Sequence, residues 1–135
     1  MTMKIEDIEG IGPTFGAKLR AVEIATVESL LEKGANPAGR KMISEMTGID
    51  SSKVLKWVNL CDLCRISGIS TQYSELLEIA GVDTVKELRN RNAENLHTKM
   101  QEVNAEKKLV RKTPGLQSVS NWVEQAKTMD PAVQY

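Results

Sequence analysis

An internal repeat of about sixty residues is the feature that most constrains how this chain folds. The stretch "IEGIGPTFGAKLRAVEIATVESLL" at 8–31 aligns with "ISGISTQYSELLEIAGVDTVKELR" at 66–89, at an offset of 58 residues. Further on, "VLKWVN" at 54–59 resembles "VSNWVE" at 119–124, now at an offset of 65. The second copy is therefore longer, and we place its extra residues within "VNAEKKLVRKT". One structural unit made twice is the simplest interpretation.

Both copies carry the apolar spacing of helices and lack the alternation typical of strands. Several polar residues and glycines stand where helices are expected to start or stop. The expected starts are Asn36, Thr84, Asn92 and Ser118, and the expected stops are Gly48 and Gly81. The sequence predicts an all-α fold, in which two tandem repeats pack as one compact helical unit.

The repeat also predicts the domain boundaries. We expect a first repeat at 1–65, a second and degenerate repeat at 66–129, and a loose C-terminal tail at 130–135. Glu23 aligns with Gly81, a residue suited to a left-handed helix cap. A left-handed glutamate costs about 1 kcal/mol, so we expect the turn at Glu23 to differ from its counterpart.

Charge and composition limit the class of protein. Lys plus Arg and Asp plus Glu number 18 each, which argues against a strongly basic coat for nucleic acid but allows a local patch. No apolar run approaches the roughly 20 residues that span a bilayer, and "MTMKIEDIEG" lacks the apolar core of a secretory signal. Only Cys61 and Cys64 are cysteines, which suits a reducing compartment. We expect a cytoplasmic protein with no membrane partner.

The stretch "IEGIGPTFGAKL" resembles the helix-hairpin-helix motif, over about residues 5 to 22, with a degenerate copy at about 60 to 80. The whole chain, from residue 5 to 128, resembles the bacterial family called domain of unknown function 4332. The residues that carry this resemblance are "IEGIGPTFGAKL", "TGIDSSKVLKWVNLCDLCRISGI", "VDTVKELRNRNAENLH", "VNAEKKLVRK" and "NWVEQAK". This resemblance implies the helical architecture of the chain. The name of the family implies no established activity for its members.

In helix-hairpin-helix proteins the backbone of the hairpin holds a DNA phosphate, often with a monovalent cation on its carbonyls. Carried over to this chain, the resemblance implies amide donors at Gly10, Ile11, Gly12, Thr14 and Phe15, with Lys18 adding a salt link. A helix N-terminus favours such an anion because its first amides are unpaired and carry partial positive charge. Binding of this kind is independent of sequence and falls with salt. We expect no other cofactor.

The sequence departs from the DNA-binding pattern in its charges. Glu9 stands where the motif usually has proline, Glu6 and Asp7 lie close by, and Ser70 replaces the second glycine in the second copy. One carboxylate beside one phosphate at a surface costs about 1 kcal/mol, comparable with what a few amide contacts contribute. A turn that only lets two helices pack closely is therefore the alternative interpretation.

The run "EKKLVRK" at 106–112 is a second candidate site. It carries Lys107, Lys108, Arg111 and Lys112. These side chains, with Arg89 and Arg91, fit a patch for nucleic acid or an acidic partner, and equally a solvated helix face.

No catalytic or metal-binding constellation is present in the sequence. Cys61 and Cys64 would need two further ligands, and His97 is the one histidine. Trp57 and Trp122 occupy matching positions, which favours core anchors over stacking platforms. We therefore expect a protein that is not an enzyme and takes no small-molecule substrate.

Two hypotheses for function remain. The first is a module that binds nucleic-acid backbone phosphate, and the second is a protein-interaction or scaffold module that has lost phosphate binding. The first predicts Lys18 and Arg20 on one face with the turn and no carboxylate folded over them. The second predicts an exposed apolar patch.

Overall fold

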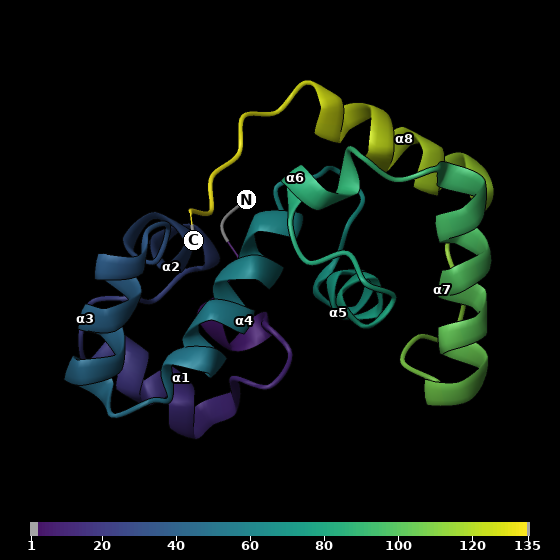
Figure 1. Cartoon of the computed structure of the whole chain (residues 1–135). Coiled ribbons are helices and arrows are strands. Elements are labelled where there is room, and N and C mark those ends of the chain that lie inside the picture. The colour runs from purple at the N-terminus through teal and green to yellow at the C-terminus, as the bar shows by residue number, and fades with distance from the viewer. Residues whose placement is uncertain (1–2, 135) are drawn as a thin grey trace. The chain divides into compact units, whose positions relative to one another are not determined.

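The computed structural model describes residues 3–134 and divides them into two compact units (Figure 1). Unit 1 takes the described residues up to Asp62 together with those from Ala132 onward, and unit 2 is Leu63–Pro131. Regular secondary structure in residues 3–134 is helical, apart from one isolated bridge between Lys4 and Thr26. This confirms the all-α fold class, while the packing of the two repeats into one unit stays a prediction.

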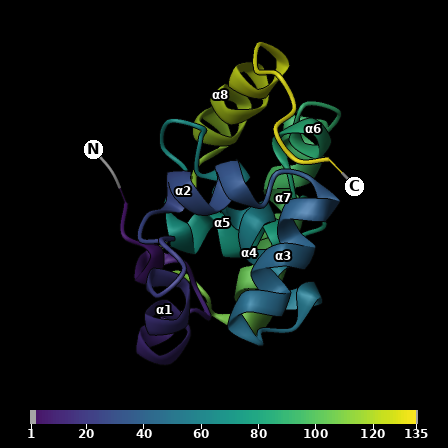
Figure 2. The same ribbon diagram turned by 90° about the vertical axis from the view of Figure 1, so that its left-hand side faces the viewer.

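Unit 1 contains a short 3-10 helix and four α-helices. They are η1 (Ile5–Asp7), α1 (Gly12–Arg20), α2 (Val27–Lys33), α3 (Pro37–Thr47) and α4 (Ser51–Leu63), whose last residue opens unit 2. Figure 2 shows α1, α2 and α3 on the side that faces the reader. The expected signals at both ends of α3 are confirmed, because Asn36 accepts a hydrogen bond from the Gly39 amide and Gly48 ends the helix with a φ of 73°.

The core of unit 1 is built around the second half of α4. Every residue from Trp57 to Asp62 is buried. Residues 3–5 are joined to residues 25–27, since the Ile5 amide donates to the Ala25 carbonyl at 3.1 Å and the Val27 amide to the Met3 carbonyl at 3.0 Å. These two bonds hold η1 in place, and η1 packs on α1.

Unit 2 contains α5 (Thr71–Ile79), α6 (Val85–Leu88), α7 (Ala93–Lys107) and α8 (Leu116–Lys127). Helix α7 packs on α5 and α8, and α6 packs on α8. Thr84 and Asn92 cap their helices as expected. The expectation for Ser118 is wrong, because α8 already begins at Leu116 with the extended Gly115 as its N-terminal boundary.

Local features recur at the offsets that the sequence repeat predicts. Gly10 has a φ of 92° and Gly68 a φ of 96°. A β-carbon on these glycines would lie 3.5 Å from the indole nitrogen of Trp57 and 3.0 Å from that of Trp122, respectively. Both tryptophans are buried, each 3% exposed, and each meets an aromatic ring of its own unit. The ring centroids are 5.2 Å apart for Phe15 and Trp57, and 5.5 Å apart for Tyr73 and Trp122.

The turn at Glu23 does not differ from its counterpart, so that expectation is wrong. Glu23 adopts the left-handed conformation with a φ of 67°, as Gly81 does with a φ of 101°. The same backbone hydrogen bond closes both turns. In unit 1 the Ile24 amide donates to the Leu19 carbonyl at 2.9 Å, and the equivalent hydrogen bond of unit 2 measures 2.8 Å. The Glu23 carbonyl also accepts from the Lys33 ammonium at 3.3 Å. Such surrounding contacts hold a strained conformation that a lone glutamate disfavours.

The C-terminal tail, expected to be loose, is attached to unit 1. The Gln134 amide donates to the Ala35 carbonyl at 2.7 Å, and the buried guanidinium of Arg40 donates to the Gln134 carbonyl at 2.6 Å. Val133 is buried beside them. Sequence pattern alone misses this attachment because its acceptors are backbone groups. In the part of the chain that is described, no helix has the length and apolar character needed to cross a membrane.

Candidate nucleic-acid interface

The hairpin between η1 and α1 depends on two glycines. Gly10 and Gly12 have φ values of 92° and 61°, in the left-handed region where a side chain is strained. Ile11 between them is buried, and its amide donates to the Ile8 carbonyl at 3.2 Å. The Ile11 amide, one of the expected phosphate donors, is therefore already paired inside the turn.

The start of α1 has no side-chain cap. Ile11 occupies the capping position, Pro13 lies in the first turn, and Thr14 is exposed. The second copy is different, since Ser70 has a φ of −82° and its hydroxyl accepts from the Tyr73 amide at 3.2 Å. The partial positive charge of the helix start is thus unshielded in α1 and shielded in α5.

Two lysines lie over Phe15, which is half-buried one helical position beyond Thr14. The Lys18 ammonium is 5.8 Å and the Lys53 ammonium 5.9 Å from the centroid of the ring. Both lysines are exposed, and both distances suit a cation–π contact. We call the group formed by Gly10, Gly12, Thr14, Phe15, Lys18 and Lys53 the hairpin surface.

Sequence reasoning missed Lys53, because it lies 35 residues from Lys18 and belongs to another helix. Asp50 lies directly before α4, where its carboxylate accepts from the Ser52 hydroxyl at 2.6 Å and the Ser52 amide at 2.8 Å. Those two hydrogen bonds, and the nearby charge of Lys53, lower the pKa of Asp50. The two hydrogen bonds direct this carboxylate toward Ser52 in the first turn of α4.

Two of the three acids near the turn have partners. Arg20 donates to both oxygens of the Glu6 carboxylate, each at 2.7 Å. Its hydrogen bond lowers the pKa of Glu6 to about 2, and the same bond raises the pKa of Arg20. Asp7 accepts from the Lys4 amide at 3.1 Å, while Glu9 is exposed. A carboxylate therefore covers Arg20, contrary to what the phosphate-binding hypothesis predicts for it.

The basic run is not one helix face. Helix α7 ends at Lys107, and Lys108 is left-handed with a φ of 54°, so the residues after it form a loop. Lys108, Arg111 and Lys112 line one open groove of unit 2, whereas Lys107 does not. Arg91 donates instead to the Gly81 carbonyl at 2.8 Å and to Glu87 at 3.0 Å. The helix-face interpretation is therefore wrong beyond Lys107.

The expected site residues thus form two groups, one in each unit. Within residues 3–134, no three His, Cys, Asp or Glu side chains gather as metal ligands. Cys61 is buried on α4, and Cys64 is half-buried directly after the end of that helix.

Fold and surface together define an all-helical protein whose first hairpin presents an uncapped helix start beside two lysines. The chain belongs to the domain of unknown function 4332 family, whose profile matches residues 9–129. Comparison with curated proteins and with solved structures gives no match.

Proposed function

We propose that this protein is a non-enzymatic module that binds the phosphate backbone of nucleic acid, without sequence specificity, through the hairpin surface. The observation that carries the proposal is the position of Lys18 and Lys53 over one aromatic ring, one turn from an uncapped helix start. A phosphate at the amides of Gly12 and Thr14 would meet the helix dipole and both ammonium groups. A monovalent cation on the carbonyls of the turn fits the same proposal.

The pairing of the neighbouring acids supports this proposal. Glu6 directs its charge to Arg20 and Asp7 accepts from the Lys4 amide, while Asp7 and Glu9 are both exposed. Repulsion by one exposed carboxylate is about 1 kcal/mol and is screened by salt. Two lysines and a helix N-terminus outweigh it.

One observation favours the second candidate function, a protein-interaction module. Met42 and Met46 lie one turn apart on α3 and are 61% and 60% exposed. Large apolar side chains exposed side by side are typical of protein-binding surfaces, and methionine adapts to varied partners. This pair supports the second hypothesis, which predicts an exposed apolar patch.

Fluorescence anisotropy of labelled double- and single-stranded oligonucleotides, at low and near-physiological salt, tests the proposal. The test variant is Lys18→Gln/Lys53→Gln, and the matched control is Lys41→Gln/Lys86→Gln, which removes two exposed lysine charges from α3 and α6. We expect the test variant alone to lose affinity and to reduce the slope of log K against log salt by about 0.9 for each lost phosphate contact.

Non-specific affinities lie on the order of 10⁻⁴ to 10⁻⁶ M at physiological salt. Absence of binding at about 0.1 mM protein in low salt contradicts the proposal. An equal loss in the test and control variants also contradicts it, because the hairpin surface would then have no special role.

A further inference from the structure

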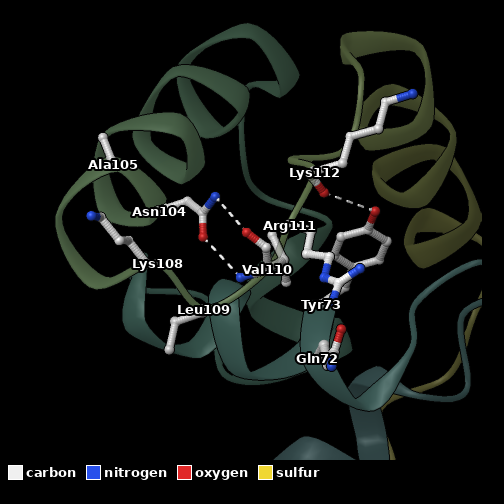
Figure 3. Close-up of a pocket in the computed structure, with 9 residues that line it drawn as sticks. All are labelled: Gln72, Tyr73, Asn104, Ala105, Lys108, Leu109, Val110, Arg111 and Lys112. Carbon is white, nitrogen blue, oxygen red and sulfur yellow. Dashed lines mark hydrogen bonds between the residues drawn. The ribbon is translucent and has the colours of Figure 1, made fainter.

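Unit 2 contains an open groove of about 780 Å³ that the hairpin surface does not include. It lies between the start of α5, the last turn of α7 and the loop that follows α7 (Figure 3). Gln72 and Tyr73 line it from α5, Asn104 and Ala105 from α7, and 108–112 from the loop. We call it the α5–α7 groove.

Side-chain hydrogen bonds hold the loop wall of this groove in place. Asn104 pairs with Val110 in both directions, accepting from its amide at 2.9 Å and donating to its carbonyl at 3.0 Å. The Tyr73 hydroxyl donates to the Lys112 carbonyl at 3.2 Å, and its ring packs on Trp122. The loop is thus fixed near its middle and at its end, which lowers the entropy cost of ordering it on a ligand.

The charge of the α5–α7 groove is of one sign. Three lining residues are cationic, Lys108, Arg111 and Lys112, and none is acidic. All three side chains are exposed. In Figure 3, Lys108 and Lys112 lie on opposite sides of the groove with Arg111 between them. Cations spread along a groove match a chain of repeated anions better than a single phosphate.

Between these charges the wall is apolar. Tyr73, Leu109 and Val110 are half-buried, so each keeps some surface toward the groove. An unpaired base has flat apolar faces that suit such a wall, whereas a base inside a duplex has both faces stacked and cannot enter. An acidic peptide would pair with the cationic side chains of the groove, but it has no repeated flat group to place against the apolar wall.

We propose that the α5–α7 groove binds single-stranded nucleic acid, with bases against Tyr73, Leu109 and Val110 and phosphates at Lys108, Arg111 and Lys112. The proposal rests on the proposed function and deepens it by naming the form of nucleic acid that the chain prefers. Duplex binding belongs to the hairpin surface, and the preference for single strands belongs to the groove.

The test compares three labelled probes of equal length on the full chain by anisotropy. They are a single strand, a single strand with abasic sites throughout its central part, and a duplex. We expect the wild type to bind the single strand at least about fivefold more tightly than the abasic strand, since base stacking adds to phosphate contacts. Arg111→Glu/Lys112→Glu should remove most single-strand affinity and leave duplex affinity within about twofold.

The matched control Lys86→Glu/Lys99→Glu reverses two exposed charges of unit 2 outside the groove and should keep the preference. Circular dichroism and thermal melting check that every variant folds. Lys18→Gln/Lys53→Gln tests the proposed function separately, because it should weaken duplex binding and keep the single-strand preference.

Equal affinity of the wild type for the normal and abasic strands overturns the groove proposal. So does a groove variant that binds single strands as tightly as the wild type. A labelled peptide of alternating Glu and Leu is the competing ligand. If the wild type shows no preference for single strands and the groove variant no longer binds this peptide, the ligand of the groove is an acidic peptide instead.

Discussion

Glu6 should weaken nucleic-acid binding, because its carboxylate pairs with the guanidinium of Arg20 beside the hairpin surface. The pair is bidentate, with both contacts at 2.7 Å, and its two side chains are 31% and 45% exposed. In Glu6→Gln the charge that holds Arg20 is gone, while the shape of the side chain is kept. Arg20 is then free to meet a phosphate.

The size of the effect follows from counterion release. One additional phosphate contact steepens the slope of log K against log salt by about 0.9 on duplex DNA. The affinity of Glu6→Gln relative to the wild type should therefore be about eightfold higher at 0.1 M salt, if the contact contributes through counterion release alone. Between about 50 mM and 200 mM salt the advantage should shrink about 3.5-fold.

Salt titration of duplex binding by anisotropy measures both quantities. Glu32→Gln on α2 removes the same charge without touching Arg20, and should give only a small, salt-screened gain. The double variant Glu6→Gln/Arg20→Gln should lose the advantage, because the released guanidinium is absent. If Glu6→Gln and Glu32→Gln change the affinity for duplex equally, or if the double variant keeps the higher affinity, inhibition by Glu6 is refuted.

Three further predictions concern stability. Glu23→Gly should stabilise the protein by up to about 0.5 kcal/mol in urea denaturation, since relief of about 1 kcal/mol of left-handed strain exceeds the roughly 0.5 kcal/mol of added entropy of the unfolded chain, and a lower midpoint would contradict this. Ending the chain at Pro131 should cost about 1–3 kcal/mol in the same assay, because the buried Arg40 guanidinium loses the Gln134 carbonyl. The lowered pKa of Glu6, about 2 against an ordinary 4.5, means that the stabilisation from its pair with Arg20 is present above pH 4.5 and is lost as the pH falls toward 2. Thermal midpoints of the wild type and Glu6→Gln should therefore converge between pH 5 and pH 2, and a constant difference would contradict the assignment.

Local signals predicted the starts of α3, α6 and α7, because a cap acts on backbone groups a few residues away. Asn36, Thr84 and Asn92 each accept the amide hydrogen bond that the sequence implies. The left-handed Glu23 and the attached tail were missed, because contacts with Lys33 and Arg40 on other elements decide them. These contacts outweigh the conformational preference of the segment itself. A sequence pattern within one segment cannot reveal them.

The candidate sites divide in the same way. The turn and Lys18 are close in sequence and were found together, whereas Lys53 reaches the ring of Phe15 only through the packing of α4. Asn104 likewise holds the basic loop by its two hydrogen bonds with Val110. The sequence did not predict the helix end that lies between these two residues, and so it did not predict this contact. Charge type was readable from the sequence, but the grouping of charges required the fold.

Position 12 and its counterpart, position 70, show how one repeated turn can serve two purposes. Gly12 takes a φ of 61° and leaves the start of α1 without a side-chain cap, while Ser70 takes a φ of −82° and caps α5 with its own hydroxyl. A capped helix start has less to offer an anion, because one of its amides is already paired. Under the proposed function, phosphate binding at a turn is therefore confined to unit 1. Unit 2 is left to act through a different surface, the basic α5–α7 groove formed where the second copy is longer than the first.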